Sequence, residues 1–227
     1  GSPKVTLVGK GVCFDRGGLN LKTPLGMRKM KKDMGGAATV LGLGHMIMDA
    51  GINLELRILI PTVENVIDNN AYRPGDIVTT RKGLTVEIDN TDAEGRVILA
   101  DALTLASEDQ PDLIIDLATL TGSARIALGT ELPAVFTQDD DIYRELKGHC
   151  NEQEDPFWRL PLWENYNRFL QSSFADITNT GTSSLAGAIT AALFLERFVD
   201  SARYWIHVDL YAWNDKNRPG RPLGGEA

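Results

Sequence analysis

Short aliphatic runs alternate with longer helical segments, and this alternation limits the fold more than any other feature of the chain. Runs typical of strands, bounded by polar or turn residues, cover residues 4–8, 54–60, 112–117 and 204–210. Helical patterns cover residues 34–50, 96–108 and 185–199. Gly51 follows the first of these segments and predicts its C-terminal cap. Strands that alternate with helices predict an α/β fold.

A β-hairpin is predicted within residues 76–88. Residues 76–80 and 84–88 are strand-like, and Arg81-Lys82-Gly83 between them supplies the turn. Because a hairpin pairs its strands antiparallel, we expect a mixed, mostly parallel sheet. No internal repeat, low-complexity tract or linker divides the sequence. We therefore predict a three-layer α/β/α sandwich formed by one domain over residues 1–227.

The charge and the residue content exclude several classes of protein. The formal net charge is −8, and the longest basic cluster is Arg28–Lys32, so no nucleic-acid partner is expected. Apolar stretches such as residues 113–120 are far shorter than the ~20 residues of a membrane span, so no membrane association is expected. Two cysteines cannot build a disulfide framework, which favours the cytoplasm. With only three dispersed histidines, any metal must be held mainly by carboxylates.

The strongest local feature is the acidic motif Asn90-Thr-Asp-Ala-Glu-Gly-Arg96, which follows a strand and precedes a helix. Asp92 and Glu94 alternate in it, and alternate side chains of an extended backbone share one face. Two neighbouring carboxylates repel each other unless a cation lies between them. Arg96 follows closely enough to hold a small anion beside them.

Two further clusters place polar side chains at strand ends or helix starts. Lys10 and Asp15 leave the first strand among glycines, with Lys22 a few residues later, and Asp33 precedes the first helix. Sheets of α/β proteins bind ligands at such junctions. The four carboxylates of these clusters and the acidic motif would neutralise two divalent cations. Paired cations of this kind activate water, which predicts a hydrolase.

Each cluster also has a purely structural interpretation. Asp33 and Asp92 could cap helices, Lys10 and Lys22 could be solvated surface residues, and the glycines could form ordinary turns. A phosphate-binding loop at residues 9–11 is not supported, because the G-x-x-x-x-G-K-[ST] spacing is absent. The cysteines, histidines and tryptophans are expected to be packing or surface residues rather than ligands.

In this order and spacing, the motifs resemble the M17 leucyl aminopeptidase (cytosol aminopeptidase) family. The likeness rests on the acidic motif, on Gly9-Lys10-Gly11 and on Met30-Lys-Lys-Asp-Met-Gly-Gly36, and it extends over nearly the whole chain. Further matches are Glu64-Asn65, Arg73-Pro-Gly-Asp76, Asp116-Leu-Ala-Thr-Leu-Thr-Gly122, Ala175-Asp176 with Asn179, and Trp205-Ile-His-Val-Asp209. The resemblance implies a dinuclear metal-dependent aminopeptidase, which removes the N-terminal residue from peptide substrates.

The resemblance also implies a set of metal ligands. Asp15 and Glu94 would bridge two divalent ions, either zinc or manganese. Asp92 would complete the more exchangeable site, and Lys10 with Asp33 would complete the tighter one. A lysine ligand must be an unprotonated amine, and a neighbouring dication makes the loss of its proton plausible.

The mechanism implied by the resemblance uses three further groups. Lys22 would polarise the scissile carbonyl and stabilise the tetrahedral species that forms when a metal-activated bridging water attacks. Arg96 would hold a bicarbonate ion, also contacted by the backbone near Leu120, and this ion would act as general base towards the water. The amino terminus of the peptide would bind near Asp33, which restricts cleavage to terminal residues.

The pocket for the terminal side chain departs from the family pattern. Besides Lys22 and Asp33, the resemblance implies that the substrate is contacted by Met30, Thr119, Gly122 and Tyr211. After the counterpart of Asp209 the family commonly carries a small pair such as Ala-Gly, whereas Tyr211 and its neighbours stand here. We expect Tyr211 to narrow or reshape the pocket, so a leucine preference does not follow. Three nearby departures, Cys13, Arg16 and Thr23, are not ligands, and metal binding is expected to survive them.

The resemblance further implies that the chain is part of a longer protein, because family members carry an additional N-terminal domain and extend the catalytic domain at both ends. It also implies a homo-oligomer, typically a hexamer. Two alternatives remain open. The chain could be a catalytically silent piece with a structural or binding role, or a two-metal phosphoesterase. Lys10 and Lys22 favour the peptidase over the phosphoesterase, whose sites usually include histidines.

Overall fold

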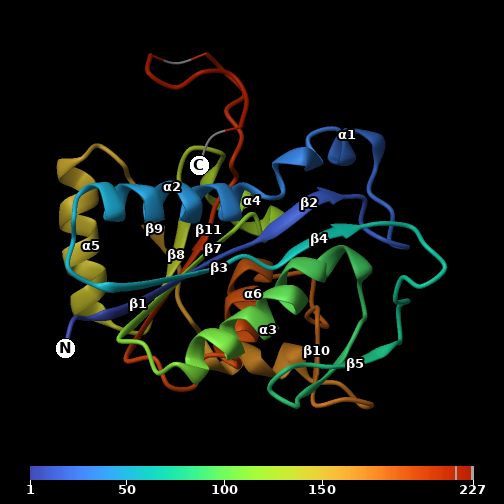
Figure 1. The fold of residues 1–227 in the computed structure, drawn as a ribbon. Helices are drawn as coiled ribbons and strands as arrows, with labels where there is room; N and C mark the ends of the chain where they lie inside the picture. The colour runs from blue at the N-terminus through green and yellow to red at the C-terminus, as the bar shows by residue number, and fades with distance from the viewer. Residues whose placement is uncertain (218, 226–227) are drawn as a thin grey trace.

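The computed structural model describes residues 1–217 and 219–225. A six-stranded sheet with the order β3-β1-β7-β11-β8-β9 lies at its centre (Figure 1). Its strands are β1 (Lys4–Gly9), β3 (Glu55–Leu59), β7 (Leu113–Ala118), β8 (Ala134–Phe136), β9 (Trp158–Arg159) and β11 (Tyr204–Asp209). Strands β3, β1, β7 and β11 pair in parallel, and β8 is antiparallel to β11. All four predicted strands are present, and the sheet is mixed and mostly parallel, as expected.

Helices cover both faces of this sheet. Helix α2 (Gly35–Asp49) lies on one face, and α3 (Glu94–Glu108) lies with α6 (Gly187–Glu196) on the other (Figure 1). Neighbouring residues of β1 point to opposite faces, as the pleat requires. Leu7 packs on the α2 side with Val40, and Val8 packs on the other side with Leu99. The predicted three-layer α/β/α sandwich is therefore confirmed.

Helix α2 begins unusually close to the sheet. A Cβ atom on Gly36 would lie 2.0 Å from the carbonyl oxygen of Leu117 in β7, so only glycine permits this approach. The Ala37 backbone N–H also donates to the Lys10 carbonyl oxygen at 3.0 Å. These contacts bring the turn before α2 to the carboxyl ends of β1 and β7.

The predicted hairpin exists, but it does not belong to the central sheet. Strands β5 (Ile77–Thr79) and β6 (Thr85–Glu87) pair antiparallel and form a separate sheet with β10 (Ile177–Thr178). The inference that this hairpin makes the central sheet mixed is wrong, because the antiparallel pair there is β8 with β11. Strands β2 (Gly11–Asp15) and β4 (Thr62–Asn65) form a third, parallel pair.

The helix boundaries differ modestly from the predicted ones. Helix α3 begins at Glu94 rather than residue 96, and Gly51, just beyond α2, has a positive φ of 61° as a C-terminal cap requires. The remaining helical segments are α1 (Pro24–Met27), α4 (Gly122–Leu128), α5 (Asp140–Glu152) and the 3₁₀ turns Met30–Lys32, Thr91–Ala93 and Glu164–Leu170. Within the described part of the chain, no helix combines the length and the apolarity needed to cross a membrane.

Candidate metal centre and active site

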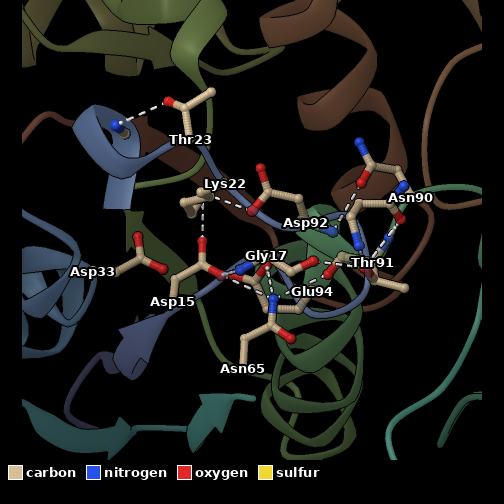
Figure 2. Close-up of polar contacts among 12 residues, drawn as sticks. Asp15, Gly17, Lys22, Thr23, Asp33, Asn65, Asn90, Thr91, Asp92 and Glu94 are labelled. Atoms are coloured by element: carbon tan, nitrogen blue, oxygen red, sulfur yellow. Dashed lines mark hydrogen bonds and ion pairs between the residues drawn. The ribbon is translucent and has the colours of Figure 1, made fainter. Parts of the chain in front are cut away.

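The predicted metal ligands meet at the carboxyl edge of the central sheet. Lys10 follows β1, Asp15 ends β2, Asp33 follows the 3₁₀ turn before α2, and Glu94 opens α3. Asp15, Asp33 and Glu94 are all buried, and each offers an oxygen atom within 4.8 Å of those of the other two. Three ionised carboxylates this close repel one another strongly unless cations separate them. Figure 2 shows these carboxylates turned towards one another.

Two lysine ammonium groups lie between these carboxylates. Lys10 Nζ is 2.8 Å from Asp33 Oδ2 and 3.1 Å from Glu94 Oε1. Burial lowers the pKa of Lys10, but the attraction of Asp33 and Glu94 outweighs it, so the net pKa is raised. A Cβ atom on Gly95 would lie 2.5 Å from Lys10 Cε, so glycine leaves the lysine its path into the cluster. The interpretation of Lys10 as a solvated surface residue is wrong.

Lys22 supplies the second of these two ammonium groups. Its Nζ is 2.8 Å from Asp15 Oδ2 and 2.6 Å from Asp92 Oδ1 (Figure 2). Burial lowers the pKa of Lys22, and the attraction and hydrogen bonds of both carboxylates raise it further than burial lowers it. The surface interpretation is therefore wrong for Lys22 as well. The two lysines occupy positions between carboxylates where cations are needed.

The carboxylates fit a divalent-metal site. Burial raises the pKa of Glu94 to about 7 despite the opposing attraction of Lys10, and burial also raises the pKa of Asp92. Buried acidic groups of this kind gain stability from a divalent cation. A set of carboxylate oxygens with one amine suits manganese or zinc, and Asp15, Asp33 and Glu94 place their oxygens close enough together to hold a metal ion.

Neither Asp33 nor Asp92 acts as the helix cap of the structural interpretation. The cap of the Thr91–Ala93 turn is Asn90, whose side chain accepts from the Asp92 N–H, and α2 begins without a side-chain cap. The expectation that Asp92 and Glu94 share a face of an extended segment is also wrong. Asp92 lies in the 3₁₀ turn and Glu94 in the helix, and the turn itself directs both towards the same cluster.

Asn65 organises the carboxylates, and the sequence alone gave it no role beyond a place in a matched motif. Its side-chain amide Nδ2 donates to Asp15 Oδ1 at 2.9 Å, to Glu94 Oε2 at 3.1 Å and to the Thr91 carbonyl oxygen at 3.0 Å. One amide thus orients two candidate ligands that come from different elements. The signal in the sequence was weak, because an asparagine at the end of a short strand has many roles.

We expect Asn65→Ala to weaken binding of Mn²⁺ by about 10- to 100-fold, the usual effect of removing a residue that orients metal ligands. Isothermal titration calorimetry with Mn²⁺ measures the loss. Asn69→Ala is the matched control, because Asn69 is exposed in the following loop. Equal affinities of Asn65→Ala and the wild type would show that the amide does not orient the ligands.

Arg96 lies in the same cavity with an unsatisfied donor. The side chain is buried, and its Nε has no hydrogen-bond partner among the described residues. Burial lowers the pKa of Arg96 to about 10, while Asp209 and Glu94 oppose the shift, so the guanidinium stays charged at neutral pH. It can therefore attract a small anion. The backbone near Leu120, which was predicted to contact the same anion, lines this cavity, and the Leu120 N–H donates to Asp209 Oδ1 at 3.0 Å.

The predicted substrate contacts line one cavity of about 470 Å³ beside the carboxylates. Met30, Thr119, Gly122 and Tyr211 all contribute to its walls, together with Lys22 and Arg96. Thr119 Oγ1 also donates to Asp33 Oδ1 at 2.7 Å and so holds that carboxylate in place. Two further lining residues, Lys32 and Arg125, were not predicted as site residues. Burial lowers the pKa of Lys32 to about 8, an effect that Asp33 opposes.

Comparison with known proteins supports the family resemblance that the sequence motifs indicated. The model of the cytosol aminopeptidase family, catalytic domain, matches residues 1–225. Probable cytosol aminopeptidases of Chlorobium luteolum and Burkholderia ambifaria are 48% and 49% identical over 91% and 96% of this chain, and the matches cover 41% and 44% of those proteins. The chain thus spans about half the length of the curated relatives it matches, or somewhat less.

Solved structures are also similar. The crystal structure of cytosol aminopeptidase from Coxiella burnetii has a TM-score of 0.97 and 58% identity, covering 100% of this chain and 50% of that one. The bottromycin maturation enzyme BotP in complex with Mn has a TM-score of 0.93 and 42% identity, covering 99% of this chain and 50% of that one. The chain therefore belongs to the cytosol aminopeptidase family, and its residues 1–225 match the catalytic domain of that family.

Proposed function

We propose that this chain carries the catalytic centre of a dinuclear, metal-dependent aminopeptidase that hydrolyses the N-terminal residue from peptides. The observation that supports this most directly is the buried cluster of Asp15, Asp33 and Glu94, neutralised by lysines at the edge of the sheet. Membership of the cytosol aminopeptidase family supports the same activity. Charged side chains that only interact with solvent stay on the surface. The burial of these ionisable groups in one cluster therefore supports a metal site.

The residues that would hold the metals are those of the cluster. Asp15 and Glu94 would be shared between two ions, with Asp92 on one side and Lys10 with Asp33 on the other. When bound, the ions supply Lewis acidity and lower the pKa of the attacking water. Manganese is supported by the carboxylate-rich ligand set and by the similarity to BotP, whose structure is described as a complex with Mn. Zinc remains the other candidate.

Lys22 would bind and polarise the scissile carbonyl. In the structure its ammonium group bonds to Asp15 and Asp92, which keep it protonated and directed into the cavity. A preorganised cation of this kind stabilises the negative charge that develops on the carbonyl oxygen. The free amino group of the peptide, as a neutral amine, would bind the metal near Asp33, a carboxylate that Thr119 holds in place. Binding the terminus there explains removal of only the first residue.

Arg96 would hold an anion, bicarbonate in our proposal, that accepts a proton from the attacking water. The unsatisfied Nε and the buried positive charge support an anion beside Arg96. The backbone near Leu120 would also contact this anion. In the structure the Leu120 N–H donates to Asp209, which holds this segment beside the cavity.

The proposal also covers the cellular location and the oligomeric state of the enzyme. The names of the relatives as cytosol aminopeptidases support a cytoplasmic location. A homo-oligomer, hexameric by resemblance to the family, would place these cavities in one assembly. Multi-angle light scattering on the purified protein measures the mass of the assembly and so the number of chains in it.

Activity of the Mn²⁺-loaded protein on leucine p-nitroanilide tests the proposal. We expect turnover that requires Mn²⁺, fails with N-acetylated substrate and drops at least about a hundredfold in Asp92→Ala, because Asp92 would be a metal ligand and a partner of Lys22. Asp49→Ala is the control, since Asp49 is exposed at the end of α2.

The same assay separates the alternatives. Hydrolysis of p-nitrophenyl phosphate in place of the anilide would favour the two-metal phosphoesterase. No turnover of either substrate, with metal demonstrably bound, would favour a catalytically silent role.

A further inference from the structure

We propose that Lys32 and Arg125, which both lie against the Tyr211 ring, form a carboxylate-binding subsite within the catalytic cavity. The inference rests on the proposed function and names a substrate class for it. The favoured substrates would carry a second carboxylate close to the scissile bond. That group could be an acidic first side chain or the free carboxyl terminus of a dipeptide.

Three separate segments bring these side chains together. Lys32 ends the 3₁₀ turn before α2, Arg125 lies in α4, and Tyr211 follows β11. Lys32 Nζ lies 4.5 Å from the centroid of the Tyr211 ring, and Arg125 Cζ lies 5.7 Å from it. All three residues line the cavity that also contains Asp33 and Lys22. Two cations that share one aromatic ring thus face the reaction site.

Neither cation has a carboxylate partner among residues 1–217 and 219–225. Lys32 is only 8% exposed, its ammonium group makes no hydrogen bond or ion pair in that part of the chain, and it lies against the Tyr211 ring. A buried charge is costly unless it is paired, and a cation–π contact replaces only part of the lost hydration. The side chain is therefore suited to pairing with an anion that arrives from the cavity.

The carboxylates nearest to Lys32 are already engaged. Asp33 is bonded to Lys10 at 2.8 Å and to Thr119 Oγ1 at 2.7 Å. Asp209 accepts from the Leu120 N–H at 3.0 Å and from Thr121 Oγ1 at 2.6 Å. Neither acid forms an ion pair with Lys32 in the described part of the chain, although the charges of both attract it. A substrate carboxylate would supply the direct partner that Lys32 lacks.

Tyr211 strengthens the preference by taking up space. Its ring lines the cavity and limits the room for a bulky aliphatic side chain. The same ring makes cation–π contacts with Lys32 and Arg125. An apolar side chain bound there would bury Lys32 further without pairing it, which is unfavourable. A carboxylate would pair with both cations. The subsite therefore discriminates by charge rather than by apolar surface.

The test compares substrates that differ only in charge. The ratios of kcat/KM are measured for glutamate against glutamine p-nitroanilide and for Leu-Gly against Leu-Gly amide, all with Mn²⁺. We expect the wild type to favour the carboxylate at least about tenfold in one of the two pairs. Lys32→Met and Arg125→Gln should each reduce that ratio severalfold or more. The ratio is the readout because misfolding or loss of metal lowers both rates alike.

Lys31→Met is the matched control. Lys31 is the exposed neighbour of Lys32, and its Nζ lies over the Trp213 ring at 5.5 Å instead of over Tyr211. It should retain the wild-type ratio. A preference in the first pair identifies an acidic side chain as the ligand, and a preference in the second identifies a terminal carboxylate. No preference in either pair, or one that survives in both variants, would overturn the subsite.

Binding measurements keep the subsite and the proposed function separable. Calorimetry with free glutamate and free glutamine, which have no scissile bond, measures the carboxylate preference in binding on Mn²⁺-loaded protein without turnover. A carboxylate preference in binding that Lys32→Met removes would support the subsite even if no substrate were hydrolysed. Turnover of neutral substrates with no carboxylate preference in either measurement would leave the aminopeptidase proposal intact and refute the subsite.

Discussion

Replacing Glu94 with glutamine is expected to lower kcat/KM for leucine p-nitroanilide by about a thousandfold, which corresponds to roughly 4 kcal/mol of lost transition-state stabilisation. Glu94 lies at the centre of the cluster, where it contacts Lys10 at 3.1 Å and Asn65 at 3.1 Å. Glutamine keeps the size of the side chain but removes the negative charge that two cations would share. The fold should tolerate the change, because burial already raises the pKa of Glu94 to about 7.

Metal content and activity need to be measured together on this variant. We expect Glu94→Gln to retain less Mn²⁺ per chain than the wild type, as determined by elemental analysis after dialysis. Glu108→Gln is the matched control, because Glu108 ends the same helix and is exposed. A Glu94→Gln protein with full metal content and activity within threefold of the wild type would remove Glu94 from the metal centre.

The largest expected effect on stability is that of Asp116→Ala, at about 3–5 kcal/mol. Asp116 is fully buried in β7 and accepts from Trp205 Nε1 at 2.7 Å, and its other oxygen lies 2.6 Å from His207 Nδ1. Trp205 and His207 lie on β11, and His207 is directly opposite Asp116 in the strand register. Alanine would leave two buried donors without an acceptor. Urea unfolding monitored by tryptophan fluorescence measures the loss.

This pair also predicts a dependence of stability on pH. Burial lowers the pKa of His207, but the attraction and hydrogen bond of Asp116 outweigh it, so the net pKa lies above 6.5. A folded-state pKa above the unfolded one gives stability that is complete below the unfolded pKa and is lost as the pH rises through the folded pKa.

The stability difference between wild type and Asp116→Asn should therefore be larger near pH 6 than near pH 9. Asparagine has nearly the same shape as aspartate, so packing changes contribute little to the comparison. A difference that stays constant or grows between these pH values would contradict a charged His207–Asp116 pair.

The alternation of aliphatic and helical segments was sufficient to predict the central layers of the fold. Residues 113–118 and 204–209 form parallel neighbours whose side chains are largely buried on both faces. The sequence shows this burial as mostly apolar runs, interrupted by Asp116 in the first and by His207 and Asp209 in the second. Short strands such as β8 and β9 carry no comparable pattern. Their pairing depends on contacts between distant segments, so the antiparallel edge of the sheet could not be predicted.

The sequence predicted which residues are candidate ligands, but not how these residues are arranged in space. The acidic motif identifies Asp92 and Glu94, yet only the 3₁₀ turn that separates them explains how both reach the cluster. The role of Asn65 could not be predicted, because its amide donates to Asp15 and Glu94, which are far from it in the sequence. Lys31 and Lys32 are alike in sequence, and the turn alone decides that one faces solvent and the other the cavity.

The central claim is that the carboxylate cluster binds divalent metal and uses it to remove residues from a free amino terminus. A mass-spectrometric time course on one peptide, with its amino terminus free or acetylated, tests this directly. With Mn²⁺ we expect stepwise loss of residues from the free terminus only, no cleavage after treatment with EDTA, and recovery when Mn²⁺ is restored. Internal cleavage, cleavage of the acetylated peptide, or undiminished activity in EDTA would contradict the claim.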